Sequence, residues 1–194
     1  QGRFGAWYHR GNHTRELWAL YGAAITDFAR LYVLDTWGGF YLDTDVVVGD
    51  SRFFNLSDGA GLQGDDPFSA HRLNNAVMRF RRGSRFLDLL ASDWVERWDA
   101  FKENPSWGFS GPGSITRAAI RAEFLGRRRF DVTWYSKRHI ATGAWHCRND
   151  TDLLAIHLLH VANLFEEGGG LARGSGTNCI REYLHRSCPA AAGT

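Results

Sequence analysis

The sequence predicts an α/β domain in which helices and strands alternate along the chain and pack in layers. Two observations favour this class: apolar residues recur at spacings of three and four over 17–36, and a run of aromatic and β-branched residues follows directly over 40–48. A third is that no internal repeat or linker interrupts the chain. With 194 residues, 44% of them hydrophobic and 23% charged, the composition is that of one globular domain spanning 1–194.

The first helix and strand form one expected unit. Leu20, Ala24, Phe28, Leu31 and Leu34 share one face of a helix over 17–36. The double glycine at 38–39 ends that helix. A strand is expected over 40–48, and a turn follows at 49–50.

The remaining elements are expected in the same alternating order. A glycine- and aspartate-rich loop is expected over 58–68. After it we expect a strand over 76–80, helices over 84–101 and 114–126, strands over 130–135 and 153–159, a glycine-rich loop, and a last helix over 180–185.

The charge and cysteine content exclude some classes of function. The net charge is +2 and the pI is near 8.6, and the basic residues are scattered except at 127–129, so nucleic-acid binding is not expected. No apolar run approaches the roughly 20 residues that span a bilayer, and no secretory signal opens the chain. The three cysteines, Cys147, Cys179 and Cys188, match no zinc pattern and permit one disulfide.

Three sequons for N-glycosylation occur, at Asn12, Asn55 and Asn149. Such sites are used in the secretory pathway, so they indicate a lumenal protein.

The segment "WGGFYLDTDVVVG", residues 37–49, places Asp43 and Asp45 inside an apparent buried strand. Buried carboxylates are costly unless they are paired or hold a cation. Side chains two apart on a strand share a face, so this pair can present both carboxylates to one hard cation. The alternative is a strand end with two exposed carboxylates.

The wider segment "ITDFARLYVLDTWGGFYLDTDVVV" resembles the core motif of glycosyltransferases with a D-x-D sugar-binding region. It is most similar to the lactosylceramide 4-alpha-galactosyltransferase and alpha-1,4-N-acetylglucosaminyltransferase family. "LNNAVMRFRRGSRFLDLL", "WGFSGPGSITR" and "AIHLLH" fall in the family's order, and "YLHRSCP" is similar to its closing segment. The resemblance covers residues 17–188.

The family's fold implies a GT-A-type nucleotide-diphosphosugar transferase with a mixed sheet flanked by helices. Only 42 residues precede Asp43, so we expect the N-terminal strand or strands of that fold to be lacking. Residues 17–80 would be the donor- and metal-binding region, and residues 81–194 the C-terminal region of the family. The implied location is the Golgi lumen, in a type II membrane protein whose N-terminal anchor this sequence lacks.

The implied activity is a metal-dependent, retaining transfer of galactose or N-acetylglucosamine from a UDP-sugar to a glycan or glycolipid. Mn²⁺ or Mg²⁺ would neutralise the departing diphosphate. In this resemblance Asp43 and Asp45 are the catalytic pair. Asp45 would be the direct metal ligand, and Asp43 would act through water or hold the donor ribose.

The resemblance also implies donor-binding residues. Asp27 and Arg30, three apart on the first helix, resemble residues that grip the donor sugar's hydroxyls; otherwise they are a surface ion pair. Tyr41 would stack on the donor or simply pack. Asn74 matches a family asparagine near the sugar, with Asn75 as its close rival.

Other motif positions keep two interpretations each. By the resemblance, His157 would complete the metal shell or touch the diphosphate; the alternative is a buried core histidine. The family usually has a tryptophan and an asparagine after this histidine, whereas this chain has Leu159 and His160. Trp107, Gly111 and Pro112 would lie in a loop near the acceptor, or only mark the start of a helix.

Two other functions compete with the transferase. A degenerate family member would bind glycans without catalysis. A haloacid-dehalogenase-type phosphatase is suggested by "FYLDTDVVV", but the acidic pair Asp65 and Asp66 precedes either lysine, against that family's order.

Overall fold

The computed structural model describes residue 6 and residues 22–63, 69–70, 72–103, 106–126, 129–136, 139–142 and 154–157. The chain divides into two compact units. Unit 1 comprises residues 1–41 and 57–134, and unit 2 comprises residues 42–56 and 135–194. The expected helix over 180–185, the glycine-rich loop and the three cysteines lie outside the described residues. The single functional domain over 1–194, with its division after residue 80, stays a prediction.

Helix α3, Gly22–Trp37, confirms the first expected helix over its described part. Its buried face includes the predicted Phe28, Leu31 and Leu34. The helix ends at Gly38, which adopts φ +71° and donates its N–H to the Leu34 carbonyl at 2.9 Å. A Cβ at Gly38 would also collide with the backbone at Arg81 and Arg82, so only glycine fits this C-terminal turn.

The larger sheet has the strand order β1-β4-β3-β5. Its strands are β1 (Gly39–Leu42), β3 (Gly59–Leu62), β4 (Leu73–Phe80) and β5 (Thr133–Tyr135). β3 and β4 are antiparallel, with an irregularity between Ala60 and Gly61. The expectation of a loop beginning at residue 58 is therefore wrong for 59–62, because pairing with the central strand β4 holds this glycine-rich segment extended.

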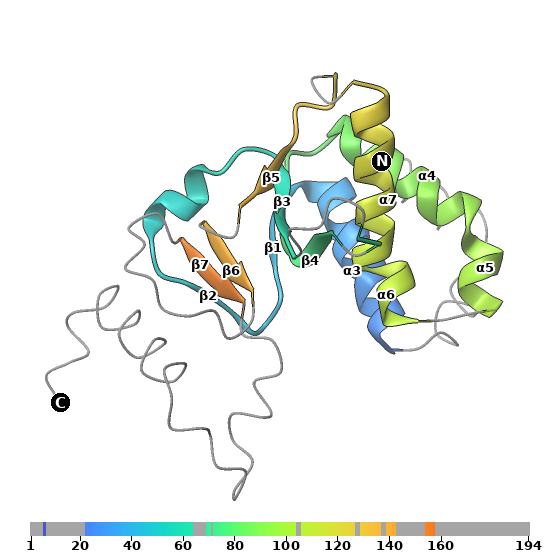
Figure 1. Cartoon of the computed structure of the whole chain (residues 1–194), viewed down its shortest axis with the longest axis horizontal. Coiled ribbons are helices and arrows are strands. Elements are labelled where there is room, and N and C mark those ends of the chain that lie inside the picture. Colours follow the sequence, from blue (N-terminus) through green and yellow to red (C-terminus); the bar gives the residue numbers. More distant parts are fainter. Residues whose placement is uncertain are drawn as a thin grey trace, which may run out of the picture. The chain divides into compact units, whose positions relative to one another are not determined.

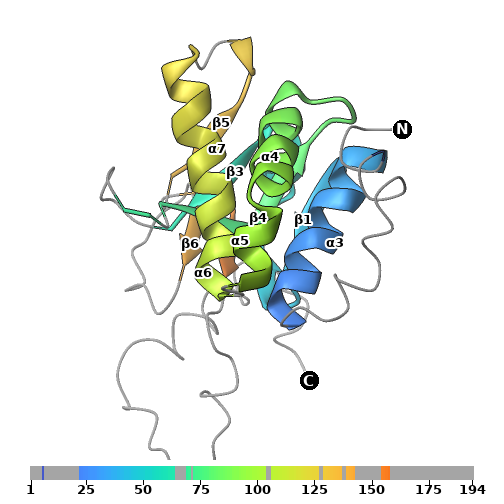
Figure 2. The same ribbon diagram turned by 90° about the vertical axis from the view of Figure 1, so that its right-hand side faces the viewer.

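Three helices pack beside one another against one face of the strands of unit 1, as Figures 1 and 2 show. They are α3, α4 (Arg85–Glu96) and α7 (Pro112–Phe124). Aromatic rings pack beneath them: Phe80 and Phe86 stack with their centroids 5.4 Å apart, and Trp94 and Phe101 lie tilted to each other at 4.5 Å. This aromatic core fixes the layer from which several candidate site residues project.

The helix expected over 84–101 is two helices, because Arg97 leaves helical geometry at φ −112° and ψ 13° and ends α4. The shorter α5, Trp98–Glu103, follows and buries Trp98 and Phe101. A one-turn helix that the sequence did not predict, α6, Trp107–Ser110, precedes α7.

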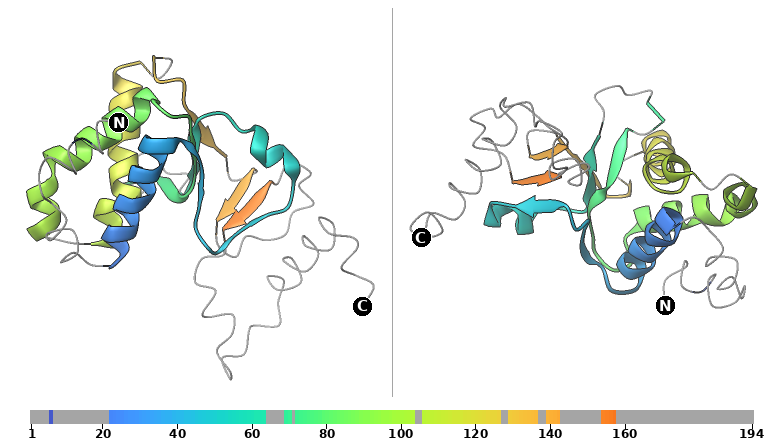
Figure 3. Two further views of the ribbon diagram at one scale, coloured as in Figure 1. Left: turned by 180° about the vertical axis from the view of Figure 1, so that it is seen from behind. Right: turned by 90° about the horizontal axis from the view of Figure 1, so that it is seen from below.

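Unit 2 contains a three-stranded sheet of order β2-β7-β6. Its strands are β2 (Val46–Val48), β6 (Ile140–Thr142) and β7 (Ala155–His157). β2 is antiparallel and β6 parallel to β7, so the sheet is mixed. The 3-10 helix η1, Ser51–Asn55, follows β2 in the chain (Figure 3). Its Phe53 side chain is buried.

Within the described part of the chain, no helix combines the length and the apolar character that crossing a bilayer requires.

Candidate active site

The D-x-D motif lies in a turn, not inside a strand. β1 ends at Leu42, the Val46 N–H donates to the Asp43 carbonyl at 3.0 Å, and β2 begins at Val46. The strand expected over 40–48 is thus wrong at its centre, because aspartate favours turns over strand interiors. Asp43 and Asp45 are half-buried, so their burial costs less than the sequence implied.

The pairing of β2 with β7 brings the backbone of His157 beside this turn. Val46, the residue after Asp45, is the direct partner of His157 across the antiparallel pair. His157 is the last residue of β7, and its place in a strand agrees with the expectation of a strand over 153–159. Among the residues whose side chains the structure describes, no group of three or more histidine, cysteine, aspartate and glutamate residues is close enough to hold a metal ion.

Asp50 follows β2 and caps η1 in the same unit. Its Oδ1 accepts the Arg52 N–H at 2.7 Å, and its Oδ2 accepts Arg52 Nε at 2.9 Å. The hydrogen bond from the Arg52 side chain is the main cause that lowers the pKa of Asp50 below 3.8, and the backbone bond adds to it. This local pair holds the chain where it leaves β2, the strand that follows the motif.

A buried polar cluster lies in unit 1 around Asp27 of α3. Asn75 Nδ2 donates to Asp27 Oδ1 at 2.7 Å, and Ser110 Oγ donates to Oδ2 at 2.7 Å. Arg30 Nε lies 3.6 Å from Oδ1. Asp27 is 3% exposed and Arg30 7%, so the alternative of a solvated surface ion pair is wrong.

Arg30 is held from three sides. It donates to the Asn75 carbonyl at 3.0 Å and to the Thr26 carbonyl at 3.3 Å, and its guanidinium lies 4.7 Å from the centroid of the Tyr41 ring. This cation–π contact with Tyr41 adds to the two hydrogen bonds in holding the guanidinium. The structure thus brings together three of the four residues predicted to bind the donor: Asp27, Arg30 and Tyr41.

Of the two adjacent asparagines on β4, Asn75 is the one that joins this cluster. The Asn74 side chain accepts the Ala76 N–H and donates to Gln63 Oε1 at 3.4 Å. Side chains alternate along a strand, so neighbouring asparagines face opposite sides.

The segment predicted to line the acceptor meets the same cluster. Trp107 begins α6, Gly111 joins α6 to α7, and Pro112 is the first residue of α7. Gly111 lies so close that an added Cβ would stand 2.8 Å from Asn75 Nδ2 and from both Asp27 carboxylate oxygens. Sequence analysis missed Ser110, which is 83 residues from Asp27 and ordinary in type; only its place inside "WGFSGPG" marks it.

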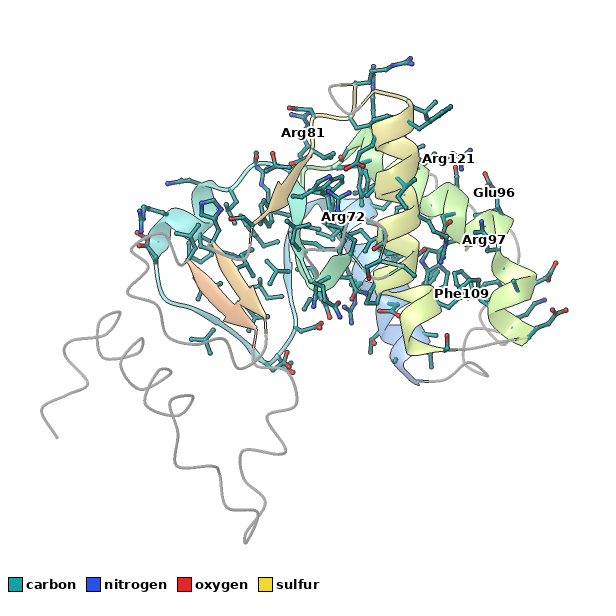
Figure 4. All side chains as sticks on the ribbon, viewed as in Figure 1. Arg72, Arg81, Glu96, Arg97, Phe109 and Arg121 are labelled. Carbon is teal, nitrogen blue, oxygen red and sulfur yellow. The ribbon has the colours of Figure 1, made fainter. Side chains whose placement is uncertain are left out.

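A second buried carboxylate, Asp93 of α4, holds α6 and α7 in place. Arg117 forms two parallel bonds to it, with Nε at 2.9 Å from Oδ1 and NH2 at 2.7 Å from Oδ2, and Ser114 Oγ donates at 2.6 Å. Arg117 also donates to the Phe109 carbonyl at 3.0 Å and lies over the Phe109 ring. An exposed pair, Arg121 with Glu96, joins α7 to α4 as well (Figure 4).

Asn55, the one predicted glycosylation site within the described residues, is exposed at the end of η1. Asn12 and Asn149 lie outside them.

Comparison with known proteins agrees with the resemblance carried by these motifs. Residues 3–58 match the family model for the glycosyltransferase sugar-binding region containing the DXD motif, a match that includes α3, β1 and the Asp43–Asp45 turn. The chain is 34% identical over 112 residues to proteins of mouse and rat named lactosylceramide 4-alpha-galactosyltransferase. It is 32% identical over 93 residues to the human protein of that name.

These matches cover parts of each chain. The mouse and rat alignments take in 58% of this chain and 28% of those proteins, and the human alignment takes in 48% and 24%. No solved structure matches the chain. The resemblance to D-x-D glycosyltransferases is confirmed.

Proposed function

We propose that the chain is the donor-binding part of a glycosyltransferase that moves galactose or N-acetylglucosamine from a UDP-sugar, with retention, to a glycan or glycolipid. The observation that carries the proposal is the buried Asp27 cluster, in a segment that matches the DXD family model. The mixed α/β architecture is consistent with a GT-A-type fold.

In this proposal Asp27 and Arg30 hold the hydroxyls of the donor sugar. A carboxylate accepts from hydroxyls, whereas a guanidinium donates to them, so the pair matches adjacent hydroxyls of opposite role. Asn75 and Tyr41 fix the geometry of these two groups through the contacts described above. Asn74 is the residue that the resemblance matches to the family's asparagine, but its side chain bonds to Gln63 and Ala76, so we propose its rival Asn75 for that role.

Asp43 and Asp45 would hold Mn²⁺ or Mg²⁺. Two carboxylates fit this role, because Mg²⁺ in nucleotide sites is bound by one or two carboxylates together with substrate phosphates. His157 is a further ligand in the proposal, since its backbone pairs with the residue after Asp45. When bound, the ion supplies positive charge that stabilises the departing diphosphate.

The remaining contribution of the chain is orientation. The side chains of Arg30 and Asp27 are already fixed by their partners. Binding of the sugar would therefore cost little side-chain conformational entropy at these two residues. Trp107, Gly111 and Pro112 are proposed to border the acceptor. By the name of the relatives, the proposed acceptor is a glycolipid of the lactosylceramide kind. We propose the Golgi lumen as the setting, with the protein of type II membrane topology. Glycosylation of Asn55 would accord with that setting.

The test is calorimetric binding of UDP to this chain with and without Mn²⁺, repeated on Asp45→Asn. We expect binding that requires the metal and weakens at least about tenfold in the variant, since one carboxylate ligand is lost. Asp50→Asn is the matched control, a nearby carboxylate in the same unit that caps η1. Binding unaffected by either metal or Asp45→Asn would contradict the metal site.

Turnover separates the transferase from its rivals. Release of UDP from UDP-galactose or UDP-N-acetylglucosamine in the presence of a β-linked galactoside supports it. Glycan binding that persists in EDTA without donor turnover would mark a non-catalytic member, and hydrolysis of an aryl phosphate lost in Asp43→Asn would mark a phosphatase.

A further inference from the structure

We propose that Ser110 is a positioning residue: its hydroxyl ties α6 to Asp27, so that the order of the α6 segment depends on whether Asp27 holds a sugar. The inference rests on the proposed function, because it takes Asp27 as the acceptor of a sugar hydroxyl. It adds a residue and a coupling that neither the motif nor the relatives' names indicate.

The Ser110 to Asp27 bond joins two parts of unit 1 that are far apart in the sequence. Both residues are buried, and the bond length of 2.7 Å is typical of a hydroxyl donating to a carboxylate. Because Asn75 bonds to Oδ1, the two carboxylate oxygens serve different neighbours: Oδ1 faces β4 and Oδ2 faces α6. A sugar hydroxyl that takes Oδ2 must share it with Ser110 or displace it.

Gly111 makes this contact sensitive to small shifts. Its backbone lies so near the cluster that no Cβ fits between Gly111, Asn75 and Asp27. The start of α7 therefore cannot come closer to α3, and the Ser110 bond limits how far α6 can move away. A change at Asp27 is passed to α6 directly, without an intervening layer of side chains.

Ser110 also has a second acceptor. Its Oγ lies 3.5 Å from the carbonyl of Ser106, one turn earlier and at the start of α6. A hydroxyl released from Asp27 can strengthen this bond within α6, while Phe109 stays held through Arg117. Sugar binding would then exchange the short bond between α6 and α3 for a longer bond within α6, which releases the segment that carries Trp107 from α3.

Amide hydrogen exchange of residues 106–111 tests the coupling in the whole chain with Mn²⁺. We expect UDP-galactose or UDP-N-acetylglucosamine to speed exchange there by about threefold or more, and UDP without a sugar to leave it unchanged, since in the proposed function the sugar and not UDP contacts Asp27. In Ser110→Ala the sugar nucleotide should still bind, within about threefold in Kd, while the exchange response is lost. Ser110→Thr, which keeps the hydroxyl, should restore it.

The control variant is Ser106→Ala on the same short helix, because Ser106 is exposed and its side chain makes no capping bond. A response that survives in Ser110→Ala, or one that UDP alone produces, would overturn the coupling while the proposed function stands. The wild-type comparison of UDP with its sugar conjugates decides the point even if a variant does not fold. Failure of the folded chain to bind either sugar nucleotide would overturn the proposed function and this inference with it.

Discussion

The energetic role of Asp27 depends on whether its side chain is exposed or buried. Spacing alone pairs it with Arg30 as a helix-surface ion pair, which is worth about 0.2–0.5 kcal/mol. In the structure both side chains are buried and each has further partners, so loss of either would leave buried charge without compensation. A cluster of this kind needs a reason beyond stability, and the proposed binding of the donor sugar would supply one.

Asp50 gives a prediction at the same scale. The Arg52 side chain, through its hydrogen bond, holds the folded-state pKa of Asp50 below 3.8. A carboxyl with a depressed folded pKa stabilises the protein above its unfolded pKa, and this contribution is lost as the pH falls through the folded value. We therefore expect η1 to lose its cap at a pH below 3.8.

A carbon-detected NMR titration of the Asp50 carboxyl measures this directly. Arg52→Ala should raise the pKa toward 3.8, whereas Arg82→Ala, which removes an exposed arginine of unit 1, should leave it in place. A wild-type value at or above 3.8 would show that the Arg52 bonds do not persist in solution.

The sequence predicted unevenly which candidate site residues lie together. Asp27, Arg30 and Tyr41 belong to a contiguous motif, so the resemblance named them together and the structure brings them together. Ser110 was out of reach, because its bond to Asp27 depends on tertiary packing of α6 against α3 and no local pattern encodes it.

At the scale of elements, local signals succeeded where they were strong. The α3 helix ends at the predicted double glycine, because Gly38 takes a left-handed φ. The prediction failed over 40–48, where apolar residues on both sides of Asp43–Asp45 read as one strand. The structure instead turns there, and β1 and β2 pair with different partner strands.

Pairing partners explain the other errors. The glycine-rich sequence of β3 predicts a loop, and β6 has only three residues. Both are strands because β4 and β7 supply their hydrogen bonds. Secondary-structure propensity does not encode such tertiary contacts. Short strands are therefore the elements that sequence analysis predicts least well.

The junction of α6 and α7 yields an element-scale prediction. Gly111→Ala places a methyl group 2.8 Å from three polar atoms of Asp27 and Asn75, so those side chains or the start of α7 must move. We expect a loss of about 1–3 kcal/mol in the free energy of unfolding, the usual cost of overpacking. Urea denaturation followed by circular dichroism measures it.

Gly22→Ala is the matched control. Gly22 begins α3, and a Cβ there would have no atom within 4 Å. Since alanine favours helix over glycine, this change should be neutral or stabilising by up to about 1 kcal/mol. Equal effects of the two substitutions would mean that Gly111 is not closely packed against the cluster.

At the scale of the whole molecule, unit 1 is the part that the helix layer makes rigid. The aromatic core beneath α3, α4 and α7 is non-directional, so it brings the helices together without fixing how they slide past one another. The buried Asp93 supplies that direction, because its carboxylate binds Arg117 and Ser114 of α7 in defined geometry.

Removing this carboxylate should therefore loosen the layer and not merely one contact. In Asp93→Ala, Arg117 loses its two parallel bonds and the buried Ser114 hydroxyl loses its acceptor, so we expect a loss of about 2–3 kcal/mol in unfolding free energy. We also expect faster amide exchange over 107–124, measured by mass spectrometry, since α6 and α7 are held through Arg117. Asp99→Ala removes an exposed carboxylate that pairs with Lys102 in α5, and should change stability by less than about 0.5 kcal/mol. If the two variants lose equal stability, hydrophobic packing alone positions α7. The bonds of Asp93 to Arg117 and Ser114 are then not needed to hold the α6 segment beside Asp27.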